Sequence, residues 1–312
     1  MIVTTVTVRV PAKINLQLAV GPLGADGYHD LVTVFHAVSL FDEVTVEAAD
    51  ADSVTVAGEG ADLVPADGDN LALRAVRALR GAIGPAGGFA GGTDADGVAV
   101  AIRKRIPVAG GLAGGSADAA AALVACNELW QAGLSARELC DVAGGVGSDV
   151  AFAVLGGTAV GRGRGEQLTS ALVAPVTYHW VLAFADGHLS TPAVYGMLDR
   201  VRADRKVGEP ELSAELMSAL RVGDPELLGA ALSNDLQAPA VSMFPALRKT
   251  LAAGIELGAL GALVSGSGPT CFFLAGSRAQ ATDLAVALSG AGVCRSVATA
   301  TGAAPGASVI DR

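Results

Sequence analysis

The sequence predicts an α+β protein of two domains. The chain has 312 residues, which is more than one hydrophobic core usually organises, so two domains are expected. Hydrophobic residues make up 51% of the chain and charged residues 17%, which is enough apolar material for well-buried cores. Strand-like alternation fills the first sixty residues, and helical and strand-like patterns are interleaved after them.

The N-terminal segments favour an antiparallel-rich sheet. Side chains alternate over residues 3–10, 13–20 and 31–38, and the segments EVTVEA and SVTVAG continue the pattern. A helix is then expected around residues 71–79, with Asp69 as its N-cap. Residues 82–97 form a glycine-rich stretch that predicts a surface loop.

Helices and strands are interleaved in the remainder of the chain. Strands are expected at residues 97–108, 177–186 and 292–300, with a hairpin over 262–276 and a strand-like segment after Gly147. The loose C-terminal tail is expected to be disordered or to pack on the N-terminal domain. Helices are expected at residues 116–131, 135–142, 191–201, 210–222, 224–236 and 244–258, and after Ser277. Glycine and charge are densest at residues 161–165, which places the domain boundary there and gives domains of residues 1–165 and 166–312.

Charge and cysteine content restrict the partners. The 21 basic and 31 acidic residues leave a net charge of −10, which argues against broad binding to nucleic acid or to an anionic membrane. The four cysteines are far apart in the sequence, so neither a zinc site nor a disulfide framework is expected. The first residues alternate like a strand, and no apolar run is long enough for a membrane helix, so we expect a soluble, cytosolic protein.

One glycine-rich loop carries the strongest functional signal. The segment RIPVAGGLAGGSADAAAALVAC, residues 105–126, places a glycine turn between a strand and a helix, an arrangement that presents backbone N–H groups to phosphate. It contains no lysine after Gly115, so it matches the P-loop poorly, and the dinucleotide fingerprint G-x-G-x-x-G is not present either. In a chain so rich in glycine and alanine, the alternative is a flexible turn with no ligand.

Three motifs in order along the chain resemble those of the GHMP kinases. They are PVAGGLAGGSADAAAAL at residues 107–123, PAKINLQLAV at 11–20 and LVSGSGPTCFFL at 263–274, with Ala113 in place of the usual middle glycine. The resemblance implies a ribosomal protein S5 domain 2-like N-terminal domain and a ferredoxin-like C-terminal domain. It also implies that ATP and Mg²⁺ are bound in the cleft between them.

The resemblance implies residues for the phosphoryl transfer. Lys13 and Asp149 would be the catalytic pair, with Asp149 accepting the proton of the acceptor hydroxyl and Lys13 lowering that hydroxyl's proton affinity. A solvated strand end and a surface turn or helix cap are their structural alternatives. Asn70 would lie near the adenine or cap a helix, and Ser116 would contact Mg²⁺. The expected phosphate-binding residues are Pro107, Val108, Ala109, Gly110, Gly111, Leu112, Ala113, Gly114, Gly115 and Ser116.

Three further segments narrow the expected substrate. DGYHDLVTVFHAVSLFDEV at residues 26–44, GSDVAF at 147–152 and NDLQAPA at 234–240 resemble family members whose acceptor alcohol carries a cytidine diphosphate. The resemblance implies the following substrate-binding residues: Tyr28 and Tyr195 stacking on the base, His29 at its edge, Asn15 on the polyol, and Ser265, Gly266, Ser267 and Gly268 lining the cleft.

Other functions stay open at this point. A homoserine or mevalonate type of GHMP kinase would share the fold without needing a base-binding triplet, and a non-catalytic nucleotide- or sugar-binding module could retain the same loops. A nicotinamide-dependent dehydrogenase is disfavoured by the missing fingerprint. The expected partner is a small molecule, and the expected assembly is a monomer or weak homodimer.

Overall fold

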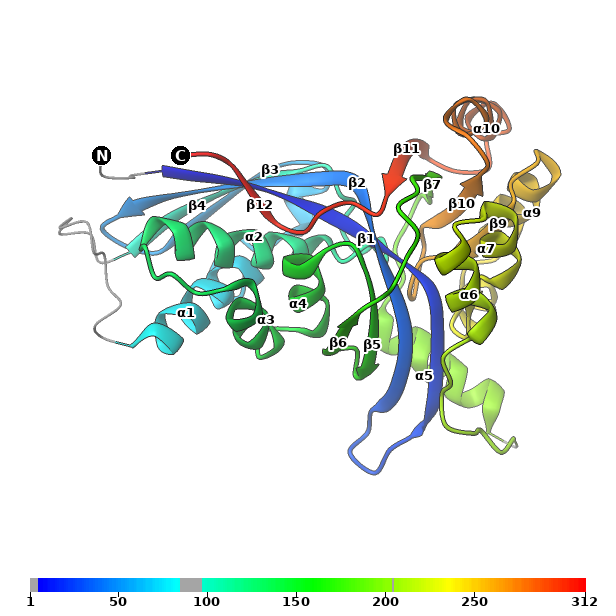
Figure 1. Ribbon diagram of the computed structural model, residues 1–312, viewed down its shortest axis with the longest axis horizontal. Helices are drawn as coiled ribbons and strands as arrows, with labels where there is room; N and C mark the ends of the chain where they lie inside the picture. The colour runs from blue at the N-terminus through cyan, green and yellow to red at the C-terminus, as the bar shows by residue number, and fades with distance from the viewer. Residues whose placement is uncertain (1–4, 85–96, 204) are drawn as a thin grey trace.

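A computed structural model describes residues 5–84, 97–203 and 205–312 of the chain. The glycine-rich loop expected at residues 82–97 lies almost wholly outside these ranges. Two sheets, one of eight strands and one of four, form the centres of two adjoining halves (Figure 1). Within the described ranges, no helix has the length and apolar character needed to cross a membrane.

The large sheet contains the antiparallel strands expected at the N-terminus. Its principal strand order is β12-β1-β2-β4-β3, while β5, β6 and β8 join at its sides. The pairing of β1 with β2 shifts register at three points, which lets these two long strands bend from one half of the molecule toward the other (Figure 1). The strands are β1 (Thr5–Leu23), β2 (His29–Ala49), β3 (Ser53–Gly58), β4 (Gly97–Lys104), β5 (Thr158–Gly163), β6 (Gln167–Ser170), β8 (Ser233–Asn234) and β12 (Ser308–Asp311).

Four helices cover one face of this sheet (Figure 1). They are α1 (Leu71–Ile83), α2 (Gly114–Leu129), α3 (Ala136–Gly144) and α4 (Ser148–Leu155). Helix α2 is buried on nearly all sides, and its alanines at 119–122 are fully inaccessible. Small side chains let it pack close to both β1 and α1, so the alanine run that follows the glycine loop has a packing function.

The small sheet has the strand order β11-β7-β10-β9 and antiparallel pairing throughout. Its strands are β7 (Tyr178–Phe184), β9 (Gly261–Val264), β10 (Cys271–Ala275) and β11 (Ser296–Gly302). Five helices, α5 (Thr191–Arg202), α6 (Ala214–Val222), α7 (Pro225–Ala231), α8 (Gln237–Met243) and α9 (Ala246–Glu256), connect β7 to β9, and α10 (Arg278–Gly290) connects β10 to β11. Numbered in chain order, the strands run 4-1-3-2 across the sheet, which confirms the predicted ferredoxin-like arrangement.

Strand β7 joins the hydrophobic cores of the two halves. Its even-numbered side chains, including Trp180 and Leu182, pack into the core shared with the large sheet. Its odd-numbered side chains Val181 and Ala183 pack under the C-terminal helices. Because neighbouring strand residues face opposite sides, one short strand can hold both cores together.

Several sequence predictions need correction. The strand-like segment expected after Gly147 is largely helical, as α4 occupies residues 148–155 before β5 begins. Helix α8 was not expected. The N-cap of α1 is Asn70 and not Asp69, because the Asn70 side chain accepts the backbone N–H of Ala72. Strong local glycine content obscured the helical period of the first segment.

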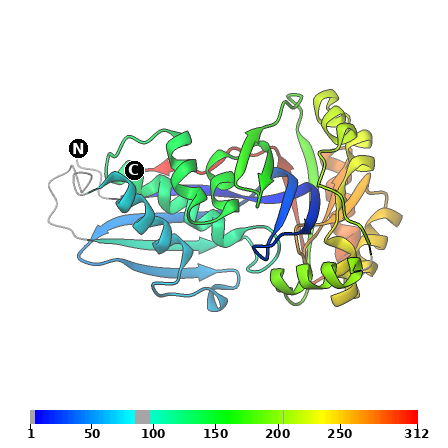
Figure 2. The same cartoon turned by 90° about the horizontal axis from the view of Figure 1, so that it is seen from below.

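The tail and the expected domain boundary also acquire definite places. The tail is ordered over β12, which pairs with β1 and so returns to the N-terminal half (Figure 2). Residue 165 lies in the turn between β5 and β6, and both of these strands belong to the large sheet. We therefore propose that the boundary falls after β6, with β8 and β12 returning from the later part of the chain to pair with β1.

Candidate active site

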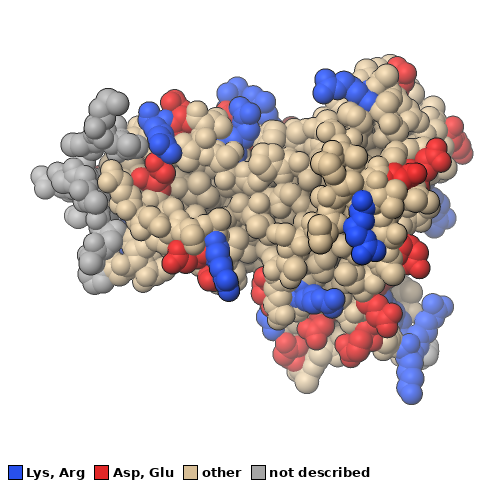
Figure 3. Space-filling model, viewed as in Figure 1, with Lys and Arg blue, Asp and Glu red and all other residues tan. Residues whose placement is uncertain are grey.

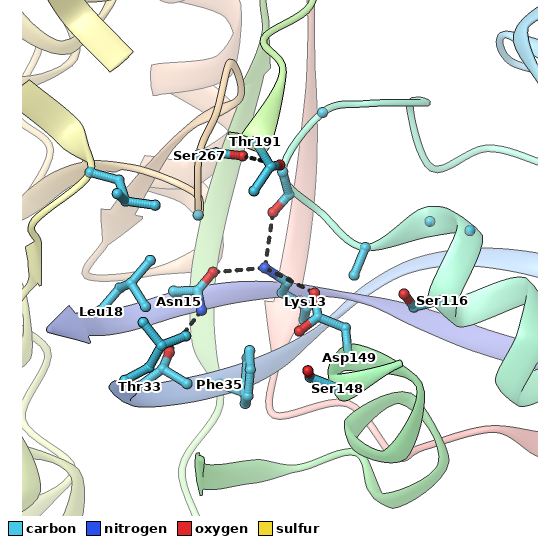
Figure 4. A pocket seen from close by; sticks show the side chains of 18 of the residues that line it. Lys13, Asn15, Leu18, Thr33, Phe35, Ser116, Ser148, Asp149, Thr191 and Ser267 are labelled. Carbon is cyan, nitrogen blue, oxygen red and sulfur yellow. Dashed lines mark hydrogen bonds and ion pairs between the residues drawn. The ribbon is translucent and has the colours of Figure 1, made fainter. Parts of the chain in front are cut away.

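A cavity of about 600 Å³ lies between the two halves and collects side chains from distant parts of the sequence. Figure 4 shows Lys13 and Asn15 from β1, Ser116 from α2 and Asp149 from α4 around it. The expected site residues that line this cavity are Lys13, Asn15, Ala109, Gly110, Gly111, Ala113, Gly114, Gly115, Ser116, Asp149, Tyr195, Gly266 and Ser267. Pro107, Val108, Leu112, Tyr28, His29, Asn70, Ser265 and Gly268 lie outside its lining.

The Lys13 ammonium is held at the centre of the cavity wall. Its Nζ donates to Asn15 Oδ1 at 2.8 Å and to the Gly111 carbonyl at 3.2 Å. It also lies 3.7 Å from Asp149 Oδ2 (Figure 4). Asn15 is fixed in turn, because its amide donates to the Thr33 hydroxyl at 2.8 Å. Lys13 is only 7% exposed, so it is not a solvated strand end.

Asp149 reaches the cavity from the first turn of α4, whose N-cap is Gly147. A carboxylate at this position is stabilised by the N-terminal end of the helix dipole. Its side chain is 32% exposed toward the cavity, while Lys13 approaches it from the other side. The carboxylate is thus accessible to a ligand hydroxyl and paired with a single ammonium group.

The glycine loop presents the open N-terminus of α2 to the same cavity. No side chain caps this helix, so the first N–H groups have no acceptor within it. Gly111 has φ 76°, and a Cβ there would lie 2.2 Å from the Ser265 carbonyl oxygen, which explains why glycine is required. Ala113 adopts φ 59°, a left-handed conformation that glycine tolerates better. The position where the family motif has glycine is therefore strained here.

A buried cluster of one lysine and two aspartates fixes the start of the glycine loop. Lys104 Nζ lies 2.5 Å from Asp42 Oδ2 and 2.6 Å from Asp118 Oδ2. Asp42 also accepts the backbone N–H groups of Arg105 and Ile106, which fixes the start of the loop. Burial raises the pKa of Asp118 to about 8; the charge of Lys104 lowers it, and that of Asp42 raises it. Burial alone would lower the pKa of Lys104, but Asp118 and Asp42 raise it.

Asn70 borders a second cavity of about 280 Å³, together with Val108, Ala109 and the buried groups of Lys104 and Asp118. Its side-chain amide donates to the Pro65 carbonyl at 2.7 Å, and its oxygen accepts from Ala72 at 2.9 Å. Both functional groups of the amide are thus engaged in shaping the end of α1. The hydrogen bonds of Asn70 are therefore those of a helix cap. The residue nevertheless borders a cavity next to the glycine loop.

Three aromatic side chains, Tyr28, His29 and Tyr195, lie in or beside the large cavity. The rings of His29 and Tyr195 have centroids 5.3 Å apart, and His29 Nε2 lies 2.8 Å from Asp199 Oδ1. Burial raises the pKa of Tyr195 to about 12, so its phenol remains neutral. Tyr28 lies outside the cavity lining and is 56% exposed. Of the three residues, only Tyr195 lines the cavity, while His29 packs against Tyr195 and Tyr28 is exposed outside the lining.

The C-terminal glycine turn closes the cavity from the smaller sheet. Ser265 is fully buried, and its hydroxyl donates to the Gly111 carbonyl at 2.9 Å, so this side chain ties the halves together. The Ser267 hydroxyl lies 2.8 Å from that of Thr191. Asn234 donates to the carbonyl groups of Val264 and Gly266 and so supports the turn from beneath.

Several site residues escaped the sequence analysis. Thr33, Phe35 and Thr191 line the cavity, yet each sits in a periodic segment that reads as ordinary core or helix. Arg164 also lines it, and its position in a charged glycine cluster was interpreted only as a domain boundary. The NDLQAPA segment was singled out by resemblance, which is the signal by which Asn234 could have been found.

Two oxygen donors of the cavity meet the needs of Mg²⁺. In the part of the chain that the structure describes, no three His, Cys, Asp or Glu side chains are grouped to hold a metal ion. Magnesium in phosphoryl-transfer sites is commonly held by one or two protein oxygens together with substrate phosphates and water. The Ser116 hydroxyl and the Asp149 carboxylate border one cavity and fit that requirement.

The surface charge and the cysteines do not indicate a second site on the face seen in Figure 3. On the face seen in Figure 3, acidic and basic side chains are scattered among neutral ones. All four cysteines are free, and burial raises the pKa of the thiols of Cys126 and Cys271. The neutral, buried thiols have a packing function.

Comparison with known proteins identifies the family. The profile of the GHMP kinases N terminal domain matches residues 70–157, and that of the GHMP kinases C terminal matches residues 216–294. A 4-diphosphocytidyl-2-C-methyl-D-erythritol kinase of Mycolicibacterium smegmatis is 55% identical over 308 residues, which cover 98% of this chain and 92% of that protein.

Solved structures agree with this result. A crystal structure of 4-(cytidine 5'-diphospho)-2C-methyl-D-erythritol kinase is 32% identical with a TM-score of 0.74 and covers 94% of this chain and 98% of its own. A homoserine kinase from Cytophaga hutchinsonii shares the fold at 19% identity with a TM-score of 0.75, covering 99% and 98%. The chain therefore belongs to the GHMP kinases, a family of ATP-dependent small-molecule kinases, and within it to the 4-diphosphocytidyl-2-C-methyl-D-erythritol kinases.

Proposed function

We propose that the protein transfers the γ-phosphate of ATP to the 2-hydroxyl of 4-diphosphocytidyl-2-C-methyl-D-erythritol, giving the 2-phosphate and ADP. The observation that carries this proposal is the position of Lys13 between Asn15 and Asp149, opposite the open N-terminus of α2. An alcohol placed between Asp149 and the N-terminus of α2 would have a proton acceptor on one side and a phosphate site on the other.

The residues divide the chemistry between them. Asp149 would accept the proton of the attacking hydroxyl, and Lys13 would stabilise the oxygen as its negative charge develops. The backbone N–H groups at Gly114, Gly115 and Ser116 would hold the transferred phosphate, with Ser116 contacting Mg²⁺. When bound, Mg²⁺ would neutralise phosphate charge. The positive charge that the loop lacks is thus proposed to come from Lys13, the helix dipole and the metal ion.

The two ends of the cleft would select the two substrates. The cavity beside Asn70 would receive the nucleoside of ATP, because it opens next to the phosphate loop and has apolar walls at Leu63, Leu71 and Val108. The corner formed by Tyr28, His29 and Tyr195 would receive cytosine, since base stacking on an aromatic ring contributes about 1–3 kcal/mol. We propose that the remaining residues of the glycine loop, 107–113, and those of the C-terminal turn, 265–268, contribute backbone contacts to the two substrates.

Activity assays test this proposal directly. ADP release with Mg·ATP should occur with the cytidine substrate and not with homoserine or mevalonate. Lys13→Met and Asp149→Asn should each lower kcat about 10²- to 10⁴-fold with an unchanged circular dichroism spectrum. Lys249→Met and Asp141→Asn, at exposed sites, serve as matched controls.

The outcomes separate the alternatives. Turnover of homoserine or mevalonate would retain a GHMP kinase with a different acceptor. Absence of all turnover would favour a non-catalytic binding module. We also propose a cytosolic enzyme acting as a monomer or weak homodimer, which light scattering of the purified protein would check.

A further inference from the structure

A cluster of three exposed side chains stands at the rim of the active-site cavity. The guanidinium carbon of Arg164 lies 3.7 Å from the ring centroid of Tyr28, and Arg164 Nη2 donates to Asp26 Oδ2 at 2.8 Å. Arg164 also belongs to the lining of the large cavity. An exposed charge pair alone contributes little, so the contact with the ring is the feature that needs explanation.

Two elements bring the cluster together. Asp26 and Tyr28 belong to the tight turn between β1 and β2, where Gly24 donates to the Tyr28 carbonyl at 2.7 Å. Arg164 follows β5, whose last residue Gly163 pairs with Leu31 of β2. The register of the large sheet therefore places the β5–β6 turn beside the β1–β2 turn.

Asp26 holds both partners of the stack. One of its carboxylate oxygens accepts the backbone N–H of Tyr28 at 3.1 Å, and the other accepts the Arg164 guanidinium. The hydrogen bond from Tyr28, and then that from Arg164, lowers the pKa of Asp26. The carboxylate thus remains charged in neutral solution, and the planar guanidinium stays over one face of the ring.

We propose that Asp26 and Arg164 form a clamp that fixes the ring of Tyr28 in advance, so that its other face is ready to stack on the base of the nucleotide-bearing acceptor. Arg164 is then a positioning residue that determines specificity for this substrate. The inference rests on the proposed function. Ordering an exposed tyrosine on binding costs conformational entropy and so weakens affinity. The clamp orders the ring before the substrate binds, so this cost does not reduce the binding free energy.

Steady-state kinetics of the full chain test the clamp. Arg164→Met should raise KM for the cytidine substrate about two- to tenfold, while kcat and KM for ATP change less than about twofold. Asp26→Asn should also raise KM. Arg164→Lys should raise KM less than Arg164→Met does, because an ammonium group keeps the charge but lacks the planar stack on the ring. Arg162→Met, an exposed change two residues earlier on β5, is the matched control and should leave both constants unaltered.

A double-mutant cycle supplies the readout that a merely structural role would not move. In a Tyr28→Leu background there is no ring to hold, so Arg164→Met should change KM by less than about 1.5-fold. An equal effect in both backgrounds would mean that Arg164 contacts the substrate directly, and the clamp would be overturned. An active wild type with no effect of Arg164→Met would overturn the clamp alone, whereas a wild type inactive on the cytidine substrate would overturn the proposed function and the clamp with it.

Discussion

The joint between the two halves contains a histidine whose protonation should destabilise the fold. His36 on β2 is fully buried, and its Nδ1 lies 2.8 Å from the Thr158 hydroxyl. Its ring meets Tyr178 and Trp180 of β7 edge-on, with centroids 5.9 and 5.5 Å away. In the described part of the chain, Nε2 has no hydrogen-bond partner. Burial lowers the pKa of His36 to about 3.

The sign of the pH effect follows from this pKa. The folded protein keeps the imidazole neutral below the ordinary pKa of 6.5, while the unfolded chain takes up a proton. The free energy of unfolding is thus unaffected by His36 above pH 6.5. As pH falls below 6.5, the titration of this one group lowers it by about 1.4 kcal/mol per pH unit. Between pH 6.5 and pH 5 the loss should reach about 2 kcal/mol.

His36→Phe retains the ring and removes the titration. At pH 7 we expect the variant to be less stable by about 1 kcal/mol, since Thr158 loses its partner. At pH 5 the order should reverse, because only the wild type bears the cost of neutralising His36 on folding. Urea unfolding followed by fluorescence, with Trp180 beside the ring as a probe, measures both values. A stability difference that is the same at pH 7 and pH 5 would refute this account of the joint.

Three further substitutions probe the loop. Gly111→Ala should lower the free energy of unfolding by about 3 kcal/mol and impair turnover, because its Cβ would meet the Ser265 carbonyl. Gly133 has a similar positive φ in open space, so Gly133→Ala should lower it by only about 1 kcal/mol. Equal losses of stability in thermal denaturation would contradict the steric argument. Ala113→Gly should relieve the left-handed alanine and stabilise the protein by up to about 1 kcal/mol, so a lower melting temperature would count against strain there. Lys104→Met should cost about 3–5 kcal/mol in urea unfolding by leaving two buried carboxylates without their cation, and a loss below about 1 kcal/mol would show that they are readily neutralised.

The sequence alone was sufficient for the fold class, most of the helices and the family. Local periodicity reports which face of a segment is buried, so strands such as β4 and helices such as α10 could be predicted without neighbours. Prediction failed at α4, where glycine and alanine blurred that periodicity. It also failed at the cap of α1, because Asp69 and Asn70 are adjacent and both are residue types that cap helices. The order of the three motifs implied Lys13 and Asp149 as a pair, although 136 positions separate them in the printed chain.

Only the tertiary structure decided how these residues meet. The 3.7 Å approach of Lys13 to Asp149 depends on the packing of α4 against β1, and no local pattern encodes that distance. The position of Arg164 over Tyr28 depends on sheet register, which arises from pairing between segments far apart in the chain. A sequence states which groups are present. Their separations, burial and charges are set by long-range packing, and the chemistry of the site depends on those quantities.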